Sequence, residues 1–202
     1  YYEGQGGWTT VDGNLVPFNS SFYENTASVV YVIMDGGNVL GDEGDLLGAF
    51  YNNELGISLE YITNVFGYEK MLPMNSGAEA VEGAVKTARK YASTNFSTKK
   101  NEIVAFNDAF HGRTMMAIAL NGSKRMTEGF GPMPAGIKHH PFNQVDGLKK
   151  IINKNTAAVI IELIQGEAGI VPAKKLFINE IKKLCRKNNA LIVIDEVQSG
   201  VG

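Results

Sequence analysis

The chain has 202 residues, of which 44% are hydrophobic and 20% charged, and its formal net charge is -2. This composition predicts a globular protein with one large domain, and it excludes the basic surface that binding to nucleic acid requires. No stretch reaches the roughly 18 apolar residues of a membrane-spanning helix, so we expect no membrane association. The single cysteine, Cys185, excludes a disulfide framework. We therefore expect a cytoplasmic protein, with the mitochondrial matrix as the alternative, and a buried, unreactive thiol.

The first part of the chain, residues 1–47, is rich in Gly, Asn, Ser and aromatic residues. Short β-prone runs such as residues 29–33 alternate with turn signals, which predicts hairpins at the edge of a sheet. From Ala49 the apolar spacing becomes helical, and this pattern stops at Gly67. We therefore divide the chain into an N-terminal segment with short strands, residues 1–47, and part of a large domain, residues 48–202. We expect the sequence to be incomplete at both ends.

Beyond Gly67, strand patterns and helix patterns alternate. Strands are predicted over four short apolar runs, at residues 71–74, 103–106, 157–162 and 191–195. Helical spacing appears between them, at residues 81–92, 148–152 and 177–184. This alternation predicts an α/β fold with a mainly parallel sheet and helices on both faces. Because ligands bind beyond the carboxyl ends of the strands in such sheets, the polar residues that follow each strand are the candidate site residues.

A glycine turn joins the first of these strands to its helix, in the run Asn75-Ser76-Gly77-Ala78-Glu79. The free amides and the positive dipole end of a first helical turn can hold a phosphate, and Gly77 lets the backbone approach it. The alternative is purely structural, with Ser76 as the helix N-cap and Glu79 completing a capping box. The two interpretations can hold together.

The run Phe110-His111-Gly112-Arg113 follows the strand at residues 103–106. An aromatic ring at this position can stack on a flat ligand, and an arginine can bind a carboxylate through two parallel hydrogen bonds. Burial statistics for aromatic residues favour the alternative that Phe110 belongs to the core.

Carboxylates follow the last two strands. Glu162 and Glu167 flank a short turn, and the pattern on its own favours loop charges over site residues. Asp195 directly follows four apolar strand residues, where a carboxylate is costly to bury unless a cation or hydrogen-bond donors meet it. A protonated pyridine nitrogen would be such a cation. His139 and His140 are expected in a surface loop with no acid or cysteine at ligand spacing, so no metal site is predicted.

Four motifs in this order closely resemble the class III pyridoxal-phosphate aminotransferases over roughly residues 49–202. They are Met74-Asn75-Ser76-Gly77-Ala78-Glu79-Ala80-Val81-Glu82, Phe110-His111-Gly112-Arg113-Thr114, Gln165-Gly166-Glu167-Ala168-Gly169 and Asp195-Glu196-Val197-Gln198. The resemblance implies the large domain of a fold type I transferase, pyridoxal 5'-phosphate as cofactor and a homodimer. Within the class, the chain is similar to the ornithine and acetylornithine aminotransferases. Leu163 stands where the class usually has proline.

The resemblance implies cofactor-binding roles for residues that follow several strands: Ser76, Gly77, Ala78, Phe110, His111, Glu162, Asp195 and Gln198. Ser76 and the two amides after it would bind the cofactor phosphate, and Phe110 would stack on the pyridine ring. Asp195, the catalytic residue expected in this chain, would keep the pyridine nitrogen protonated, which makes the ring an electron sink. Gln198 would bond the phenolic oxygen, and Glu162 would support the cofactor.

For the substrate, the resemblance implies that Arg113 holds the α-carboxylate and that Glu167 governs entry of an ω-amine. The lysine that forms the Schiff base would lie beyond Gly202. The implied reaction moves the terminal amino group of L-ornithine to 2-oxoglutarate, giving glutamate 5-semialdehyde and glutamate. N-acetylornithine and 4-aminobutyrate are alternative substrates. A non-catalytic relative that acts as a binding partner, or a domain for another phosphorylated ligand, are alternatives of other classes.

Overall fold

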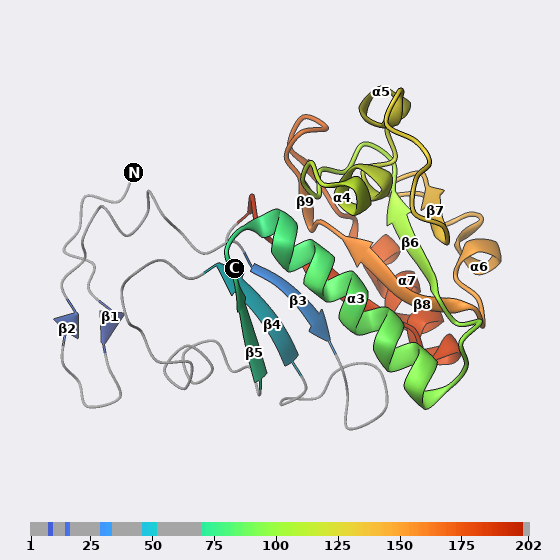
Figure 1. Cartoon of the computed structure of the whole chain (residues 1–202), viewed down its shortest axis with the longest axis horizontal. Coiled ribbons are helices and arrows are strands. Elements are labelled where there is room, and N and C mark those ends of the chain that lie inside the picture. Colours follow the sequence, from blue (N-terminus) through green and yellow to red (C-terminus); the bar gives the residue numbers. More distant parts are fainter. Residues whose placement is uncertain (1–7, 10–14, 17–28, 34–45, 52–69, 200–202) are drawn as a thin grey trace.

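The structure is a computed structural model that describes residues 8–9, 15–16, 29–33, 46–51 and 70–199, and Figure 1 draws the other residues as a grey trace. Near the N-terminus, β1 (Trp8–Thr9) and β2 (Leu15–Val16) form a short antiparallel pair. Most of the helix that we expect between Ala49 and Gly67 lies outside the described residues.

Within the described residues, seven strands form one sheet. Their spatial order is β5 (Lys70–Met74), β4 (Leu46–Tyr51), β3 (Val29–Ile33), β11 (Leu191–Asp195), β8 (Thr156–Ile161), β6 (Glu102–Phe106) and β7 (Ile137–His140). All neighbouring pairs are parallel except those of β3, which runs antiparallel to both β4 and β11. The predicted α/β fold with a mainly parallel sheet is confirmed.

Two predictions about the N-terminal half are wrong. The run at residues 29–33 pairs antiparallel with the next strand, β4, as in a hairpin, but not at a sheet edge, because β3 lies between β4 and β11. Ala49 is not the start of a helix, because it lies in β4 and pairs with Val30 on β3. Both errors have one physical cause: strand formation here depends on partners far along the chain, which local apolar spacing does not contain.

Two long helices cover the sheet. Helix α3 (Gly77–Asn95) lies across one face, and α7 (Lys175–Asn188) lies on the other (Figure 1). Each helix buries one apolar stripe; on α3 the stripe consists largely of alanines, which let the helix approach the strands closely. The short helices are α4 (Met115–Leu120), α5 (Lys124–Thr127) and α6 (Leu148–Ile151). No helix in these described ranges is long and apolar enough to cross a membrane.

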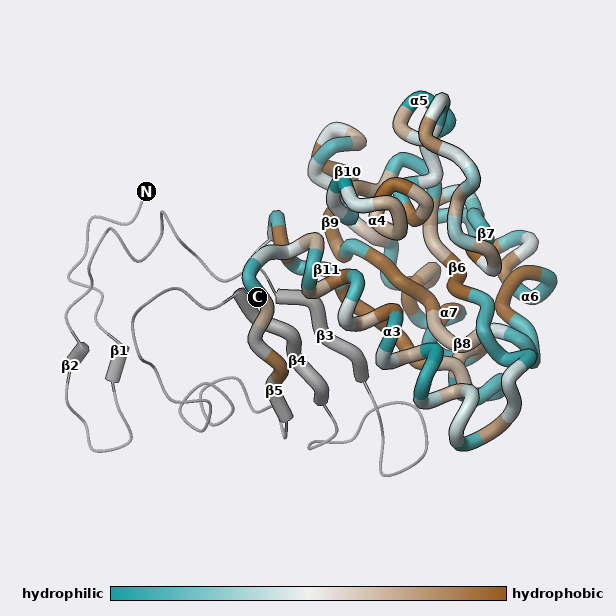
Figure 2. The backbone as a smooth tube through the Cα atoms, viewed as in Figure 1, coloured by the Kyte–Doolittle hydropathy of each residue, from teal (hydrophilic) through white to brown (hydrophobic). Residues whose placement is uncertain are grey.

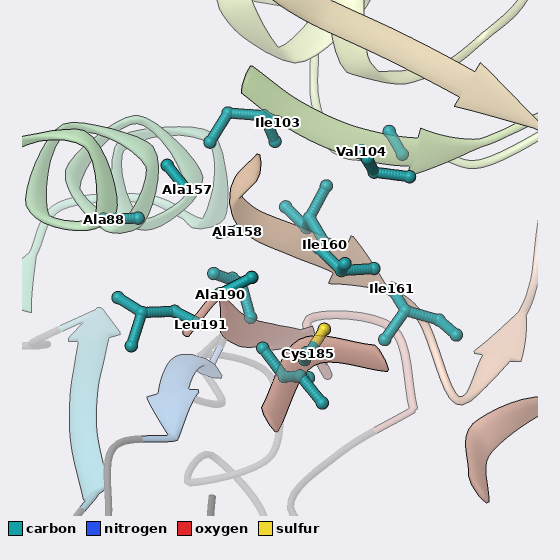
Figure 3. Close-up of a cluster of buried hydrophobic side chains, with 14 of the residues drawn as sticks. Ala88, Ile103, Val104, Ala157, Ala158, Ile160, Ile161, Cys185, Ala190 and Leu191 are labelled. Carbon is teal, nitrogen blue, oxygen red and sulfur yellow. The ribbon is translucent and has the colours of Figure 1, made fainter. Parts of the chain in front are cut away.

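The core lies on both faces of β8, whose six residues are all buried. In Figure 2, β6 and β8 are hydrophobic over much of their length. Figure 3 shows Ala88 of α3 near Ala157 on one side of the strands, and Cys185 of α7 with Ala190 on the other. Cys185 is fully buried, and this burial raises the pKa of its thiol. The predicted burial of the Cys185 thiol is therefore confirmed.

The sheet brings the polar residues of several strand ends to one edge. The strands β5, β6, β8 and β11 point the same way, since β3 reverses direction twice between β11 and β4. Their carboxyl ends therefore meet at the same edge, where Ser76, Asn107, Glu162 and Asp195 lie. A short antiparallel pair, β9 (Ile164–Gln165) and β10 (Val171–Pro172), projects beyond this edge.

Candidate active site at the carboxyl edge of the sheet

The first turn of α3 contains both a capping interaction and free donors. Ser76 is the N-cap, and its Oγ accepts the N–H of Glu79 at 3.2 Å. The Glu79 carboxylate turns back and accepts the N–H of Asn75 at 2.8 Å. The N–H groups of Gly77 and Ala78, which precede the first intrahelical bonds, have no acceptor within the helix. The structural and the anion-binding interpretations of this motif thus coexist, because the capping groups leave these two donors available.

The loop that follows β6 packs against this helical turn. Gly112 has a φ of +115°, a conformation that favours glycine, and a Cβ at this position would lie 2.9 Å from the Cβ of Ala78. The loop carrying Phe110 and Arg113 is therefore held next to the free amides of α3. Phe110 is half-buried, which leaves part of its ring accessible, and the exposed Arg113 guanidinium lies 5.9 Å from the ring centroid.

Asp195 forms a buried pair with His111. The Nδ1 of His111 lies 2.7 Å from Oδ2 of Asp195, and both side chains are almost fully buried. The other carboxylate oxygen, Oδ1, accepts the N–H of Val197 at 3.1 Å. Each oxygen of Asp195 thus has one protein donor and retains a lone pair for a further donor. On the far side of the imidazole, Nε2 of His111 is buried and has no hydrogen-bond partner within the described residues.

Glu162 belongs to the same cluster. It is only 4% exposed, and its carboxylate accepts the N–H of Phe110 at 3.0 Å. Burial raises the pKa of Glu162 to about 7, although the neighbouring His111 and the Phe110 N–H act in the opposite direction. The sequence pattern favoured a loop charge at this position, and that interpretation is wrong, because the β8 strand carries Glu162 into the interior before the loop begins.

The remaining predicted residues lie at the periphery. Glu167 and Gln198 are both exposed, as the interpretation of Glu167 as a loop charge requires. Gln198 lies against Gly166, where an added Cβ would collide with the Gln198 amide, so the two loops that carry these residues are in contact. The structure therefore brings most of the predicted set to one edge, with Asp195 and Glu162 buried and Arg113, Glu167 and Gln198 around them.

The two remaining histidines do not lie in a loop, which corrects the prediction. His139 and His140 end strand β7, because residues 137–140 pair with β6. His140 is buried, and its Nε2 lies 3.0 Å from the carbonyl oxygen of Gln144. Across the described part of the chain, no group of three or more His, Cys, Asp or Glu residues is arranged to hold a metal ion.

Two side-chain amides that are buried at this edge, Asn121 and Gln165, were not identified from the sequence. Asn121 is fully buried and contacts the loop after β6, and Gln165 donates from Nε2 to the carbonyl of Asn107 at 3.0 Å. Asn121 precedes Gly122 at the end of an apolar segment, which is an ordinary turn signal and reveals nothing about burial. No local signal identifies either residue, because their partners lie elsewhere in the sequence.

These groups fit one kind of ligand. The α3 amides can bind a phosphate, the Phe110 ring can stack on a planar heterocycle, and the Asp195 carboxylate can pair with a protonated ring nitrogen. The buried, unpaired Nε2 of His111 adds a polar atom with no protein partner described at this edge. A phosphorylated pyridine such as pyridoxal phosphate has all the required features.

Comparisons with known proteins agree with this geometry. Residues 46–202 match the family model described as "Aminotransferase class-III", a family that depends on pyridoxal phosphate. An ornithine aminotransferase from Staphylococcus carnosus is 47% identical, over 76% of this chain and 39% of the relative. An acetylornithine/succinyldiaminopimelate aminotransferase from Buchnera aphidicola is 50% identical, over 63% of this chain and 32% of the relative.

A succinylornithine transaminase from Photorhabdus laumondii is 41% identical, over 77% of this chain and 39% of the relative. Among solved structures, the ornithine aminotransferase from Toxoplasma gondii superposes with a TM-score of 0.67 and 32% identity, covering 74% of this chain and 36% of that chain. That crystal structure has partial occupancy of pyridoxal phosphate at its active site. The chain spans less than two fifths of the length of each of these proteins.

Proposed function

Because the chain belongs to the class III aminotransferases, we propose that it supplies the cofactor-binding part of an enzyme that transfers the terminal amino group of L-ornithine to 2-oxoglutarate. The products would be glutamate 5-semialdehyde and glutamate. The observation that carries this proposal is the buried Asp195 carboxylate, held by two donors beside the free amides of α3. A protonated ring nitrogen would occupy the lone pairs of Asp195 that His111 and the Val197 N–H leave free.

The cofactor would be bound at three places on this chain. The N–H groups of Gly77 and Ala78, with the Ser76 hydroxyl, would bind its phosphate at the positive end of α3. Phe110 would stack on the ring, and its position is set by the Glu162 carboxylate on its N–H. When bound, pyridoxal phosphate supplies an electron sink for the carbanion that forms as the substrate loses a proton.

Asp195 would hold the proton of the pyridine nitrogen. A carboxylate opposite this nitrogen favours the protonated ring, and burial strengthens the electrostatic interaction between them. His111 would belong to the cofactor site through its contact with Asp195. Gln198, on the loop that follows β11, would donate to the phenolic oxygen.

The substrate would bind at the exposed side of the site. The Arg113 guanidinium would hold the α-carboxylate of the amino acid through paired hydrogen bonds. Glu167, on the loop between β9 and β10, would govern how an ω-amine enters. The names of the relatives divide between ornithine and its N-acylated forms, and the structural similarity to an ornithine aminotransferase supports ornithine. A second copy of the chain would complete a homodimer.

The test uses the full-length protein. Borohydride reduction followed by peptide mass spectrometry should find a pyridoxyl group on one lysine, which we expect beyond Gly202. Turnover of L-ornithine, N-acetylornithine and 4-aminobutyrate with 2-oxoglutarate should then give the largest kcat/KM for L-ornithine. A larger value for N-acetylornithine would reassign the substrate. A protein that retains no cofactor, or that retains it and turns over none of the three, would overturn the proposed activity.

A further inference from the structure

A fully buried asparagine holds the loop that carries the predicted cofactor residues. Asn121, at the end of α4, accepts the N–H of His111 on Oδ1 at 2.7 Å. Its Nδ2 donates to the carbonyl of Gly112 at 3.1 Å and lies 3.4 Å from the sulfur of Met126. Its side chain therefore binds the two backbone groups on either side of the His111–Gly112 peptide, in the manner of a neighbouring strand.

The residue held in this way is the one that contacts Asp195. The Oδ2 atom of Asp195 is an acceptor, so the Nδ1 of His111 must carry the hydrogen of their 2.7 Å contact. This contact fixes both the tautomer and the plane of the ring. A shift of the His111 backbone by about 1 Å would break the bond, since hydrogen bonds weaken steeply beyond their usual length.

We propose that Asn121 is a positioning residue of the cofactor site, which acts through the His111 backbone and imidazole to orient the Asp195 carboxylate. The relay has two links, Asn121 to His111 and His111 to Asp195, and neither Asn121 nor His111 needs to contact the substrate. The expected effect on cofactor binding rests on the proposed function. The two links themselves rest only on the hydrogen bonds of Asn121 and His111.

The packing around the loop explains why a side chain is needed here. On one side Gly112 lies against alanines, with a Cβ position 2.9 Å from Ala78 and 3.3 Å from Ala117, so the loop cannot move toward α3 or α4. On the other side, the Asn121 amide accepts the His111 N–H and donates to the Gly112 carbonyl. The amide is not needed to cap α4, because the Asn121 backbone N–H makes that bond to Ala117. Two of its three side-chain contacts therefore serve the loop, and the third reaches the sulfur of Met126 on α5.

The first experiment measures the tautomer of His111 in the cofactor-free, 15N-labelled full-length protein. Its imidazole should show a hydrogen on Nδ1, and the signal is assigned by its loss in His111→Asn. The Asn121→Leu variant removes all side-chain hydrogen bonds of Asn121 at similar volume. We expect it to shift or broaden the Nδ1–H signal of His111, although the substituted side chain does not touch the imidazole hydrogen bond.

The second experiment measures the dissociation constant of pyridoxal phosphate by absorbance titration. Asn121→Leu should raise it at least about tenfold, the effect of losing one ordering interaction of ordinary strength. The matched control is Asn188→Leu, which also removes side-chain bonds, to the carbonyls of Leu184 and Ile152. Asn188 lies at the end of α7, near the opposite edge of the sheet, and its loss should leave the dissociation constant within twofold.

The second link is tested by a pair of variants at His111. The side chain in His111→Asn can donate from the position of Nδ1, so this variant should retain most of the cofactor affinity. The side chain in His111→Leu cannot donate, so this variant should lose at least as much cofactor affinity as Asn121→Leu. If Asn121→Leu does not fold, this pair together with the wild-type tautomer decides the proposal. An unchanged His111 signal and unchanged affinity in Asn121→Leu, an Nε2–H tautomer in the wild type, or equal affinities in the His111 pair would each overturn it.

These outcomes separate the relay from the proposed function. A wild-type protein that binds no pyridoxal phosphate would remove the function, and the tautomer measurements would still decide whether Asn121 orients His111. A wild-type protein that binds the cofactor while Asn121→Leu behaves like Asn188→Leu would leave the function standing and remove the relay.

Discussion

The two edges of the sheet both bury charged side chains, and they do so in different ways. At the amino edge, Lys100 is only 4% exposed, and its Nζ donates to the carbonyls of Asn188, at 2.6 Å, and Lys154, at 3.4 Å. At the carboxyl edge, Asp195 and Glu162 lie among donors that include His111 and the Phe110 N–H. The amino edge pairs a cation with backbone carbonyls near the end of α7, a structural arrangement. The carboxyl edge gathers three titratable side chains, Asp195, Glu162 and His111, in one cluster.

This difference shows what marks a site among buried charges. Lys100 has two backbone acceptors, and burial lowers the pKa of its amine, while the neighbouring Cys185 thiol acts in the opposite direction. At the carboxyl edge, Nε2 of His111 is buried without a partner in the described residues, and the Gly77 and Ala78 amides have no acceptor within α3. A buried atom without a partner does not mark a site by itself, because Oε2 of Glu102, at the amino edge, is also buried and unpartnered within the described residues. At the carboxyl edge, the unpaired His111 atom lies together with two buried carboxylates, an arrangement that a polar ligand can satisfy.

The largest expected effect is at Asp195. Asp195→Asn keeps the shape of the side chain and removes the charge that would hold the pyridine proton. We expect kcat of the full-length enzyme to fall by at least about 10²-fold, as when one preorganised electrostatic contact is removed. The measurement is steady-state turnover of L-ornithine with 2-oxoglutarate, with protein stability followed in parallel. Activity within tenfold of the wild type would remove Asp195 from the catalytic role.

The next effect is a pH dependence that originates at Glu162. Because burial raises its pKa to about 7, the folded protein retains a proton that the unfolded chain releases near pH 4.5. The stabilisation that this proton gives is complete at low pH and is lost as the pH rises through about 7. Between pH 5 and pH 8 the wild type should therefore lose about 2 kcal/mol more unfolding free energy than Glu162→Gln.

The measurement for Glu162 is urea unfolding of both proteins at several pH values. The glutamine is a matched control, because its carbonyl can still accept the Phe110 N–H. Parallel stability curves for the two proteins would show that Glu162 is ionised throughout and would bring it closer to an ordinary surface carboxylate.

At the amino edge, we expect a substitution to lower stability without lowering cofactor affinity. Lys100→Met leaves the carbonyl of Asn188 without its donor, and we expect the unfolding free energy to fall by about 2 kcal/mol, the usual size for a hydrogen bond to a charged group. The affinity for pyridoxal phosphate, measured by absorbance titration, should stay within twofold. A lower affinity for pyridoxal phosphate in Lys100→Met would show that the two edges are coupled and that the amino edge is not purely structural.

The smallest expected effect concerns the exposed rim. Arg113→Lys keeps the charge and loses the paired geometry, so KM for the amino acid should rise about tenfold while kcat changes little. Initial rates over a range of L-ornithine concentrations separate the two constants. A fall in kcat at constant KM would place Arg113 at the reacting centre and not at the substrate carboxylate.

Much of the fold could be predicted because its determinants are local. The apolar runs that became β5, β6, β8 and β11, and the spacing that became α3 and α7, have the periods of their elements in the sequence itself. The errors lie where pairing is distant. Ala49 joined a strand because β3 and β5 lie on either side of it, and the run at residues 29–33 became an interior strand because β11, far along the chain, pairs with it.

The candidate site divides in the same way. By itself, the sequence determined where the polar residues stand relative to each strand end, and this was enough to select Ser76 and Asp195 as candidates, since in a parallel sheet such positions converge. Only the tertiary structure decided that Glu162 is buried, that His111 meets Asp195 and that Asn121 holds the loop between them. Burial and hydrogen-bond geometry depend on neighbours that are up to 84 residues apart in the chain, and no local pattern records them.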